Sequence, residues 1–475
     1  MDLTTLTIKQ SHEGLKNGDF TSVDLTKAYL ENIKKSDLNA FITVTEELAL
    51  EQARVADERI ALRLRSGQTF GLLCGIPCAI KDNILIEGLN CTASSRILEN
   101  YVAPYDATVI KKLKEQGVVF LGKANLDDSA MGASGETSIF GATKNPHDRT
   151  RVPGGTSSGS VTAVAAGEAA FALGSDTGGS IRQPSSFCGV VGFSPTYGAV
   201  SRYGLIAHAS SLDQIGPITK NIEDCEIVFE AISGKDKMDA TSTDYKFEEL
   251  GISLKGLKIG VPKEYFAAGI EEEVKKIIKS TIKKAEDAGA EIIEISLPST
   301  EYALACYYII GPSEISANLA RLDGIKYGLS ENGKDLLDVY LKSKGHGFGP
   351  EIKRRIMLGT YSLSSGYYDA YYKKAQEVRQ LVRQDFEKAF SKVDLLFCPV
   401  SPFPAFKLGE KLDDPLLMYL ADIYTIPLKL AGLPGLSMPA GKTEDGLPVG
   451  LQIIGNHFEE NKILAVAEEM EKLLT

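Results

Sequence analysis

The stretch that decides the fold covers residues 151–180 and reads RVPGGTSSGSVTAVAAGEAAFALGSDTGGS. Two glycine-rich loops, each crowded with hydroxyl side chains, flank a run of small residues that predicts a short, tightly packed helix. Glycine allows unusual backbone conformations and brings N–H groups close to a bound atom, so the second loop can offer both a nucleophile and an oxyanion site. These loops therefore predict acyl-transfer chemistry.

A serine nucleophile needs a base, and no histidine lies in or near either loop. The candidate base is Lys81, which lies in the apolar segment FGLLCGIPCAIKDNILI of residues 70–86. Burial lowers the pKa of a lysine, and Ser–Lys pairs are known variants of serine-based catalysis. The alternative is a structural lysine whose charge emerges at the end of a strand.

The composition is that of a globular protein, because 43% of the 475 residues are hydrophobic and 24% are charged. A net charge of −11 argues against a chain that binds nucleic acid by itself, although a basic partner could do so. No apolar run reaches the ~20 residues of a membrane span and the N-terminus lacks a signal sequence, so we expect a cytoplasmic protein. The seven cysteines are predicted to be reduced and buried; a zinc site at Cys74 and Cys78 is the weaker interpretation.

Two other chemistries find little support in the sequence. The loop GGTSSGS lacks the lysine that a phosphate-binding P-loop would use. Five histidines in unrelated contexts argue against a Ser-His-Asp triad, and neither paired carboxylates nor a metal-ligand cluster stands out.

Segments with helix and strand patterns alternate along the chain, which predicts an α/β fold. Residues 1–66 are typical of a peripheral helical layer, and residues 70–220 of a glycine-rich catalytic core. Residues 222–390 are more charged and show αβ and helical patterns, whereas residues 391–475 are again glycine-rich, with an α/β pattern. Because residues 70–220 and 391–475 share a glycine-rich composition that residues 222–390 lack, we expect one domain with an inserted lobe.

Several elements can be predicted individually. Ser22 is the predicted N-cap of the helix that follows it. Residues 181–198 predict a loop, a buried strand and a turn, and residues 361–390 predict one long amphipathic helix whose tyrosine-rich start serves core or interface packing. Two paired strands are predicted over residues 431–441 and 446–455.

Residues 151–184 and the segment around Lys81 resemble the amidase signature family, whose pattern GGSSGGS…DTGGSIR is long and specific. The resemblance covers essentially the whole chain and is greatest to the A subunits of tRNA-dependent amidotransferases. It is carried by the segments IKDNI, TASSRILENYVAPYDATV, SRYGLIAHASSLDQIGPIT, ANLARLDGIKYG, KRRIMLGTYSLSSGYYDAYYKKAQ and AGLPGLSMPAG. It implies a single large α/β domain with a central twisted mixed β-sheet covered by helices on both faces.

The resemblance also implies a Ser–Ser–Lys triad. Ser180 corresponds to the acyl-accepting serine and Lys81 to the neutral lysine base. Thr156 corresponds to the intermediate serine, which relays the proton and follows a cis peptide bond. The N–H groups of the implied oxyanion hole come from Thr177, Gly178, Gly179 and Ser180.

The implied substrate is glutamine, which acylates Ser180 and releases ammonia before water clears the γ-glutamyl ester. Arg355 corresponds to the arginine that binds the α-carboxylate, Asp422 to the acid that binds the α-ammonium, and Tyr307 to a further substrate contact. These residue types suit those roles, because a guanidinium binds a carboxylate with two hydrogen bonds and an acid pairs with an ammonium.

The implied partners are the B and C subunits of a heterotrimeric amidotransferase. Ammonia would pass to the B subunit, which would use ATP and Mg²⁺ to amidate glutamate or aspartate on tRNA(Gln) or tRNA(Asn). The charged tRNA would bind mainly through that partner, and neither a cofactor in this chain nor a membrane is expected. Two alternatives stay open: a paralogous amidase that hydrolyses or forms a different amide, and a catalytically weak scaffolding subunit.

The chain departs from the family pattern around the predicted reaction centre. Thr156 keeps the hydroxyl of the relay but adds a methyl group, which can hinder the placement of that hydroxyl. The other departures are Ser129, Gly135, Ser158, Ser185, Ser186, Ser194 and Ala199. The three positions implied in glutamine binding keep the residue types of the family.

Overall fold

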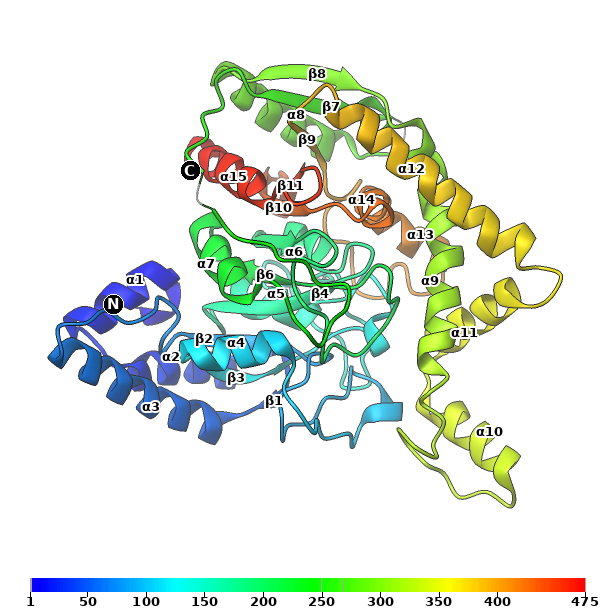
Figure 1. Ribbon diagram of the computed structural model, residues 1–475, viewed down its shortest axis with the longest axis horizontal. Helices are drawn as coiled ribbons and strands as arrows, with labels where there is room; N and C mark the ends of the chain where they lie inside the picture. The colour runs from blue at the N-terminus through cyan, green and yellow to red at the C-terminus, as the bar shows by residue number, and fades with distance from the viewer. Residues whose placement is uncertain (1, 249, 268, 475) are drawn as a thin grey trace.

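The computed structural model describes residues 2–248, 250–267 and 269–474, with one large mixed β-sheet at its centre (Figure 1). Within these residues the sheet has eleven strands in the order β1-β3-β2-β4-β6-β5-β10-β11-β9-β7-β8. The strands are β1 (Phe41–Val44), β2 (Pro77–Lys81), β3 (Val119–Ala124), β4 (Phe171–Asp176), β5 (Val191–Ser194), β6 (Gln214–Thr219), β7 (Lys258–Pro262), β8 (Glu291–Ile295), β9 (Leu395–Pro399), β10 (Gly435–Lys442) and β11 (Pro448–Ile454). β2 runs parallel to β3 and β4, and β7 parallel to β8 and β9, whereas the other pairs are antiparallel. The predicted α/β fold is confirmed, as are the paired strands near the C-terminus.

Helices cover both faces of this sheet. The described α-helices are α1 (Ile8–Asn17), α2 (Ser22–Lys35), α3 (Glu46–Arg65), α4 (Thr108–Gln116), α5 (Ser158–Ala165), α6 (Arg182–Cys188), α7 (Ile222–Ile232), α8 (Glu272–Asp287), α9 (Ala303–Leu319), α10 (Leu336–Gly347), α11 (Pro350–Leu363), α12 (Lys374–Phe390), α13 (Pro415–Tyr419), α14 (Ile426–Ala431) and α15 (Glu460–Leu474). α5 and α6 contact each other and the central strands, while α4, α7, α15 and α8 form a second contiguous row.

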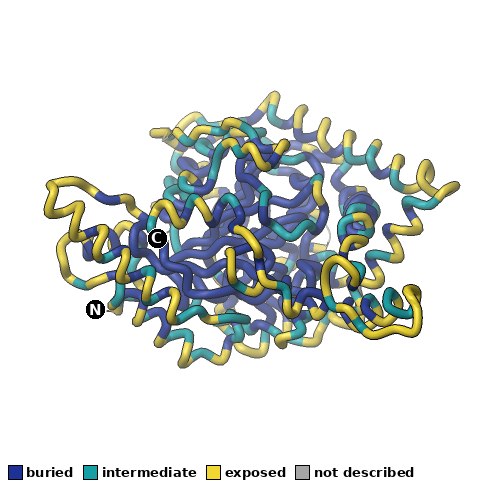
Figure 2. The backbone as a smooth tube through the Cα atoms, turned by 60° about the horizontal axis from the view of Figure 1, so that its bottom comes forward, coloured by how far each residue is buried: buried dark blue, intermediate teal, exposed yellow. Residues whose placement is uncertain are grey.

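The central strands are enclosed on both sides, as the dark core of the tube in Figure 2 shows. Every residue of β2, β3 and β4 is buried. A strand covered on both faces cannot alternate between apolar and polar residues, which explains the nearly continuous apolar segment that contains β2. The carboxyl ends of these strands are therefore shielded from water, and the two glycine-rich loops lie next to them.

Helices α9 to α12 form the side of the molecule drawn at the right in Figure 1. The prediction of a single long helix over residues 361–390 is wrong. α11 ends at Leu363, Gly366 takes a left-handed φ of +90°, and a π-helical turn over Asp369–Lys373 leads into α12. Only glycine adopts such a φ readily, so the chain turns there. Tyr367 and Tyr368 are 44% and 45% exposed, so core packing does not explain them.

Two other local predictions also need correction. Residues 181–198 contain a helix, α6, before the predicted buried strand β5; all seven residues of α6 are buried against the sheet, so the helix lacks an amphipathic pattern. The N-cap of α2 is Thr21 and not Ser22, since Thr21 Oγ1 accepts the N–H of Asp24 in a reciprocal capping box. Ser22 is instead buried, and its hydroxyl donates to the Gly75 carbonyl.

Candidate active site

Lys81 lies at the carboxyl end of β2, between β3 and β4. Its side chain is completely buried. Lysine is rarely found in such a position, because removing an ammonium from water is costly. The alternative of a charge that emerges from the end of a strand is therefore wrong.

Oxygen atoms of the first glycine-rich loop and of the end of β4 surround the Lys81 amine. The Nζ atom lies 2.8 Å from Thr156 Oγ1, 2.9 Å from Ser157 Oγ and 3.0 Å from Ser175 Oγ. The Ser175 carbonyl lies 3.2 Å from the same nitrogen. An amine in such a setting can exchange a proton with a neighbouring hydroxyl.

The environment of Lys81 favours the uncharged amine. Burial lowers the pKa of Lys81 to about 7, while the carboxylates of Asp127, Asp176 and Asp213 act in the opposite direction. At neutral pH a substantial fraction of the amine therefore carries no proton and can accept one. A lysine in water, with a pKa of ~10.4, could not do so.

The first glycine-rich loop is built so that Thr156 meets the amine. Its Gly155–Thr156 peptide bond is cis, and Gly154 has a left-handed φ of +84°. A Cβ on Gly154 would lie 2.5 Å from Gln183 Oε1, so this position requires glycine. The same Gln183 oxygen accepts the Gly155 N–H at 3.0 Å. Helix α6 thereby fixes the loop that carries Thr156.

The second loop, residues 177–180, is joined to the first by a backbone hydrogen bond. The Ser157 N–H donates to the Ser180 carbonyl at 3.0 Å. Two further hydrogen bonds hold this loop: Thr177 Oγ1 donates to Asp213 Oδ1 at 2.7 Å, and Arg182 Nη2 donates to the Gly178 carbonyl at 3.0 Å. The loop is thus held at three points, as a preorganised oxyanion site requires.

A buried ion pair lies at the base of this loop. Asp176 ends β4, and Arg182 binds its carboxylate through Nε and Nη2, each at 3.1 Å. The Ile181 N–H donates to the same carboxylate at 3.1 Å. Both side chains are completely buried. A fork-to-fork contact of this kind fixes orientation as well as charge.

Tyr307 and Asp422 pack directly against the second loop. A Cβ on Gly178 would lie 3.1 Å from the Tyr307 hydroxyl oxygen, and a Cβ on Gly179 would collide with the Asp422 carboxylate and the Thr425 hydroxyl. Burial raises the pKa of Asp422 to about 7, and nearby Asp176 acts in the same direction. A cation bound next to this carboxyl group would lower its pKa and restore its ionised form.

Arg355 on α11 contributes a buried cation beside a cavity. Its side chain is 4% exposed, and Nε donates to Glu351 Oε1 at 2.8 Å. The guanidinium also lies over the Tyr308 and Tyr419 rings, 5.3 and 5.8 Å from their centroids. The cavity has a volume of about 310 Å³, and its lining includes Asp128, Met131, Ser134, Arg355 and Tyr419.

The structure therefore brings Lys81 and Thr156 into contact and joins the loop of Thr156 to the loop that carries Ser180. Tyr307 and Asp422 lie against that second loop, and Arg355 is near enough to affect the pKa of Asp422. The catalytic and binding roles of these residues stay predictions. Sequence reasoning missed the contacts that Ser157 and Ser175 make with Lys81. Ser157 lies in the first glycine-rich loop, and Ser175 lies near the end of β4, two residues before the second loop.

One buried histidine, His208, lies near the site. Burial lowers its pKa to about 3, and the positive charges of Arg355 and Lys81 act in the same direction. The imidazole is therefore neutral at physiological pH, and it would be a very weak base.

Other features of the described residues give little reason to expect a different centre. Within the part of the chain that the structure describes, no group of three or more His, Cys, Asp or Glu side chains could hold a metal ion. The seven cysteines are free and buried, as predicted. Among the described helices, none is long and apolar enough to cross a membrane.

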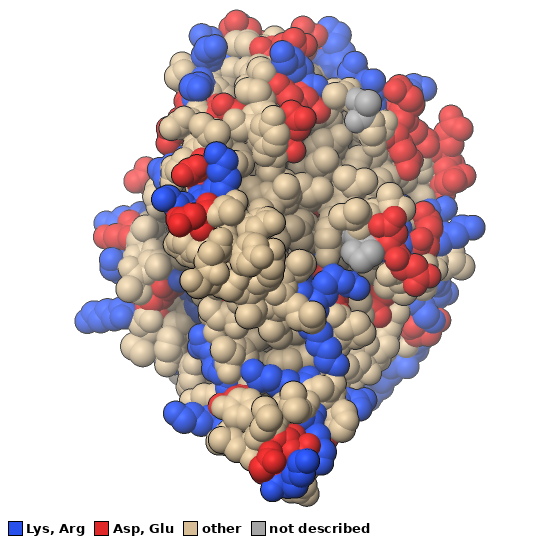
Figure 3. All heavy atoms as spheres, turned by 90° about the vertical axis from the view of Figure 1, so that its right-hand side faces the viewer, with Lys and Arg blue, Asp and Glu red and all other residues tan. Residues whose placement is uncertain are grey.

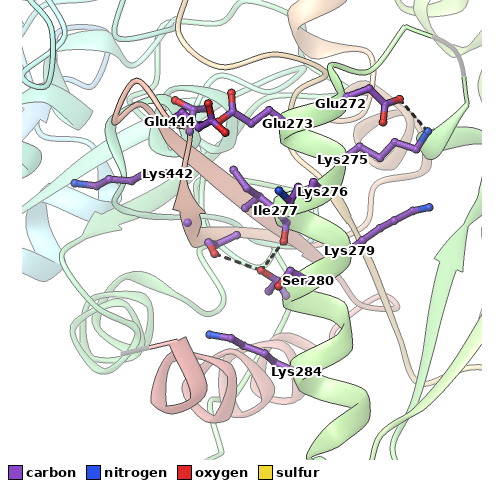
Figure 4. Close-up of a pocket in the computed structure, with 14 residues that line it drawn as sticks. Glu272, Glu273, Lys275, Lys276, Ile277, Lys279, Ser280, Lys284, Lys442 and Glu444 are labelled. Carbon is purple, nitrogen blue, oxygen red and sulfur yellow. Dashed lines mark hydrogen bonds and ion pairs between the residues drawn. The ribbon is translucent and has the colours of Figure 1, made fainter.

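A wide groove of about 1000 Å³ lies between α8 and the β10–β11 hairpin (Figure 4). Lysines are frequent along it, but Lys279 and Lys442 extend in opposite directions, away from a common centre. Thr281 Oγ1 is satisfied by the carbonyls of Ile277 and Ala440. The groove therefore lacks the convergent polar groups of a binding site.

A mixed sheet that carries a buried lysine between two hydroxyl-rich glycine loops defines the class of amidase-type enzymes. The family model described as Amidase matches residues 24–464 of this chain. The chain therefore belongs to the amidase signature family.

Its relatives include the A subunit of the Glutamyl-tRNA(Gln) amidotransferase of Caldanaerobacter subterraneus subsp. tengcongensis, which is 58% identical over 99% of this chain and 97% of the relative. The crystal structure of the corresponding A subunit from Thermotoga maritima, also named for Glutamyl-tRNA(Gln) amidotransferase, has a TM-score of 0.80 and 43% identity, over 99% of this chain and 95% of that one. The peptide amidase of Stenotrophomonas maltophilia has a TM-score of 0.82 and 28% identity, over 98% and 96%.

Proposed function

We propose that this chain is the glutaminase subunit of a tRNA-dependent amidotransferase, in which it releases ammonia from glutamine for a partner protein. The observation that carries the proposal is the 2.8 Å contact between Lys81 Nζ and Thr156 Oγ1, made in a buried site next to the loop of Ser180. The relative named as the A subunit of a Glutamyl-tRNA(Gln) amidotransferase, identical at 58% of positions over almost the whole chain, supports the choice of reaction.

The mechanism begins with the neutral amine of Lys81. It accepts the proton of Thr156 Oγ1, which in turn takes the proton of Ser180 Oγ as that oxygen attacks the side-chain amide carbon of glutamine. The N–H groups of residues 177–180 stabilise the oxyanion that forms. The proton returns through Thr156 to the leaving nitrogen, so that ammonia departs and a γ-glutamyl ester remains on Ser180.

Water completes the cycle. The amine of Lys81, again neutral, accepts a proton from water through the same hydroxyl relay as the water oxygen attacks the ester carbon. The carbon–oxygen bond to Ser180 breaks, the serine recovers its proton, and glutamate is released. One glutamine and one water thus yield one glutamate and one ammonia.

The amino-acid end of glutamine would be bound by Arg355, Asp422 and Tyr307. The guanidinium of Arg355 suits the α-carboxylate, and the buried carboxyl of Asp422 suits the α-ammonium. Because burial raises the pKa of Asp422 to about 7, binding of a cation there would favour loss of its proton. Tyr307 lies against Gly178 and would contact the substrate close to the oxyanion site.

The partners in this proposal are the B and C subunits of a heterotrimer in the cytoplasm. ATP and Mg²⁺ would act at the B subunit, which would bind most of the charged tRNA and amidate its glutamate or aspartate. The chain's surface supports a partner, because the face that carries α10 and α11 has a broad uncharged area, tan in Figure 3. Exposed apolar side chains on these two helices include Leu336, Leu337, Leu341, Met357 and Leu358.

A paralogous amidase that acts on another amide is the second candidate, and the 28% identical peptide amidase favours it. The two can be separated by measuring ammonia release from glutamine and from a peptide amide, with and without the B and C subunits. The proposal predicts glutamine preference and transfer of the ammonia to Glu-tRNA(Gln) or Asp-tRNA(Asn) in the complex. A preference for the peptide amide, with no transfer in the complex, would contradict it.

A further inference from the structure

A second buried lysine, Lys429, takes no part in the mechanism above. It lies on α14 and is 2% exposed. Its Nζ atom donates to Ser194 Oγ, on β5, at 3.2 Å. A buried ammonium needs a nearby negative charge as well as a hydrogen-bond acceptor, and a serine hydroxyl supplies only the acceptor.

The negative charge comes from the base of the second glycine-rich loop. Burial lowers the pKa of Lys429 to about 8, while Asp176 and Asp213 act in the opposite direction and Arg182 and Arg202 act in the same direction as burial. In turn, Lys429 helps to keep the pKa of Asp176 low. Asp176 is therefore paired directly with Arg182 of α6 and lies within electrostatic range of Lys429 of α14.

The single positive charge of Arg182 does not neutralise both buried carboxyls near the second loop, Asp176 and Asp213. Besides its pair with Asp176, it donates to the carbonyls of Gly178 and Thr425 and to Gln452 Oε1. Asp213 is a second buried carboxyl in the same cluster and makes hydrogen bonds with Thr177 and with the N–H groups of residues 208 and 209. Lys429 supplies a second positive charge against two carboxyls.

We propose that Lys429 is a positioning residue for the acyl-transfer site, whose ammonium, held at Ser194 Oγ, balances Asp176 at the base of the oxyanion loop. What matters is the position of the ammonium and not the element that carries it. Because Ser194 Oγ is in contact with the ammonium, a lysine at residue 194 can deliver its own ammonium to the same space. For its activity readouts, this inference rests on the proposed function.

The direction of the effect on Lys81 follows from charge. Lys81 faces Asp127, Asp176 and Asp213, and all three raise its pKa. Removing the Lys429 charge leaves Asp176 less neutralised, so Lys81 holds its proton more tightly. Since the base acts only when neutral, the acid limb of the pH profile of kcat/KM then moves to higher pH.

The test is a double-mutant cycle in the full chain, co-expressed with its B and C subunits: wild type, Lys429→Gln, Ser194→Lys and the double variant. We expect each single variant to lower kcat/KM for glutaminase activity by about tenfold, because one removes the ammonium and the other crowds two together. The double variant should recover to within about threefold of wild type. Lys442→Gln, which removes an exposed lysine, is the matched control and should leave the activity unchanged.

The pH profile separates positioning from a merely structural role. The acid limb should move to higher pH in Lys429→Gln, to lower pH in Ser194→Lys, and back to the wild-type position in the double variant. A Lys429→Gln profile that is lower but not displaced, or a double variant no more active than the weaker single variant, would overturn the inference.

Thermal unfolding of the same four proteins keeps this result distinct from the proposed function. A wild-type complex without glutaminase activity would refute the proposed function. The unfolding temperatures would still test whether a lysine at residue 194 can replace the ammonium of Lys429. Both single variants should unfold at a lower temperature than wild type, and the double variant should recover most of this decrease. If the decreases in unfolding temperature of the two single variants simply add in the double variant, the inference is overturned, whether or not the complex has glutaminase activity.

Discussion

At the scale of the residue, the amine of Lys81 explains the most about the site. It lies at the end of a completely buried strand, where a charged lysine would be costly, and oxygen atoms of four groups surround it. Each of the three hydroxyls can donate to a neutral amine or accept from a charged one. The site can therefore hold either protonation state, as a general base must.

The pKa of Lys81 leads to a prediction about pH. Because burial lowers this pKa to about 7, kcat/KM for glutamine should rise with pH and level off above about pH 7 to 8. The sign follows from the role of base: protonated lysine is inactive, so activity is lost as the pH falls through the pKa. A kcat/KM profile measured between pH 5 and 9 checks this. A limb that rises only near ~10, the value of a lysine in water, would contradict it.

Thr156 gives the second prediction at this scale. Its Oγ1 reaches Lys81 at 2.8 Å although the side chain carries an extra methyl group. Thr156→Ser keeps the hydroxyl and removes the methyl, so glutaminase kcat should be preserved or raised. Thr156→Val keeps the shape and removes the hydroxyl, so kcat should fall by ~10²–10⁴-fold, as expected when a proton-transfer group is lost. A Thr156→Ser enzyme slower than the parent would contradict the view that the methyl group hinders the relay.

At the scale of the element, the loop of residues 177–180 depends on close packing. Gly179→Ala would drive a methyl group into the Asp422 carboxylate and the Thr425 hydroxyl. We expect glutaminase kcat/KM to fall at least about 100-fold, since displacement of oxyanion donors costs ~10²–10³-fold. Gly345→Ala in α10 is the matched control, because its Cβ would meet open space. Equal activity of the two variants would show that the loop tolerates displacement.

Elements also show what could be predicted from the sequence. The glycine loops, the strand that ends at Lys81 and the C-terminal strand pair were predictable, because glycine positions and apolar runs are local signals. α6 was not, since all seven of its residues are buried, polar ones included, and this burial follows from contact with the sheet. The break before α12 depends on the left-handed Gly366, and the contacts of Ser157 and Ser175 with Lys81 depend on tertiary packing.

At the scale of the whole molecule, the sheet joins segments that are far apart in sequence. β10 and β11 lie between β5 and β9, so the C-terminal strands connect the catalytic core to the strands of residues 258–295. The division of the chain into a core and an inserted lobe stays a prediction. The continuous sheet nevertheless leads us to expect that these parts unfold together.

Leu451 tests that expectation. It lies on β11, in register with Met438 of β10 and Pro399 of β9, and is completely buried. Leu451→Ala should lower the free energy of unfolding by ~2–5 kcal/mol and should keep a single transition in a denaturant titration. Leu337→Ala is the matched control, because this leucine is 67% exposed and its loss should cost less than ~0.5 kcal/mol. Two separate transitions in the parent chain would contradict a cooperative sheet.

The measurement that tests the central claim most directly is mass spectrometry of the chain after rapid mixing with glutamine and acid quenching. We expect a γ-glutamyl group on Ser180, present in the parent and absent from the Ser180→Ala and Lys81→Ala variants. An adduct on another residue, or ammonia release that continues in both variants, would contradict acylation of Ser180 driven by a buried lysine.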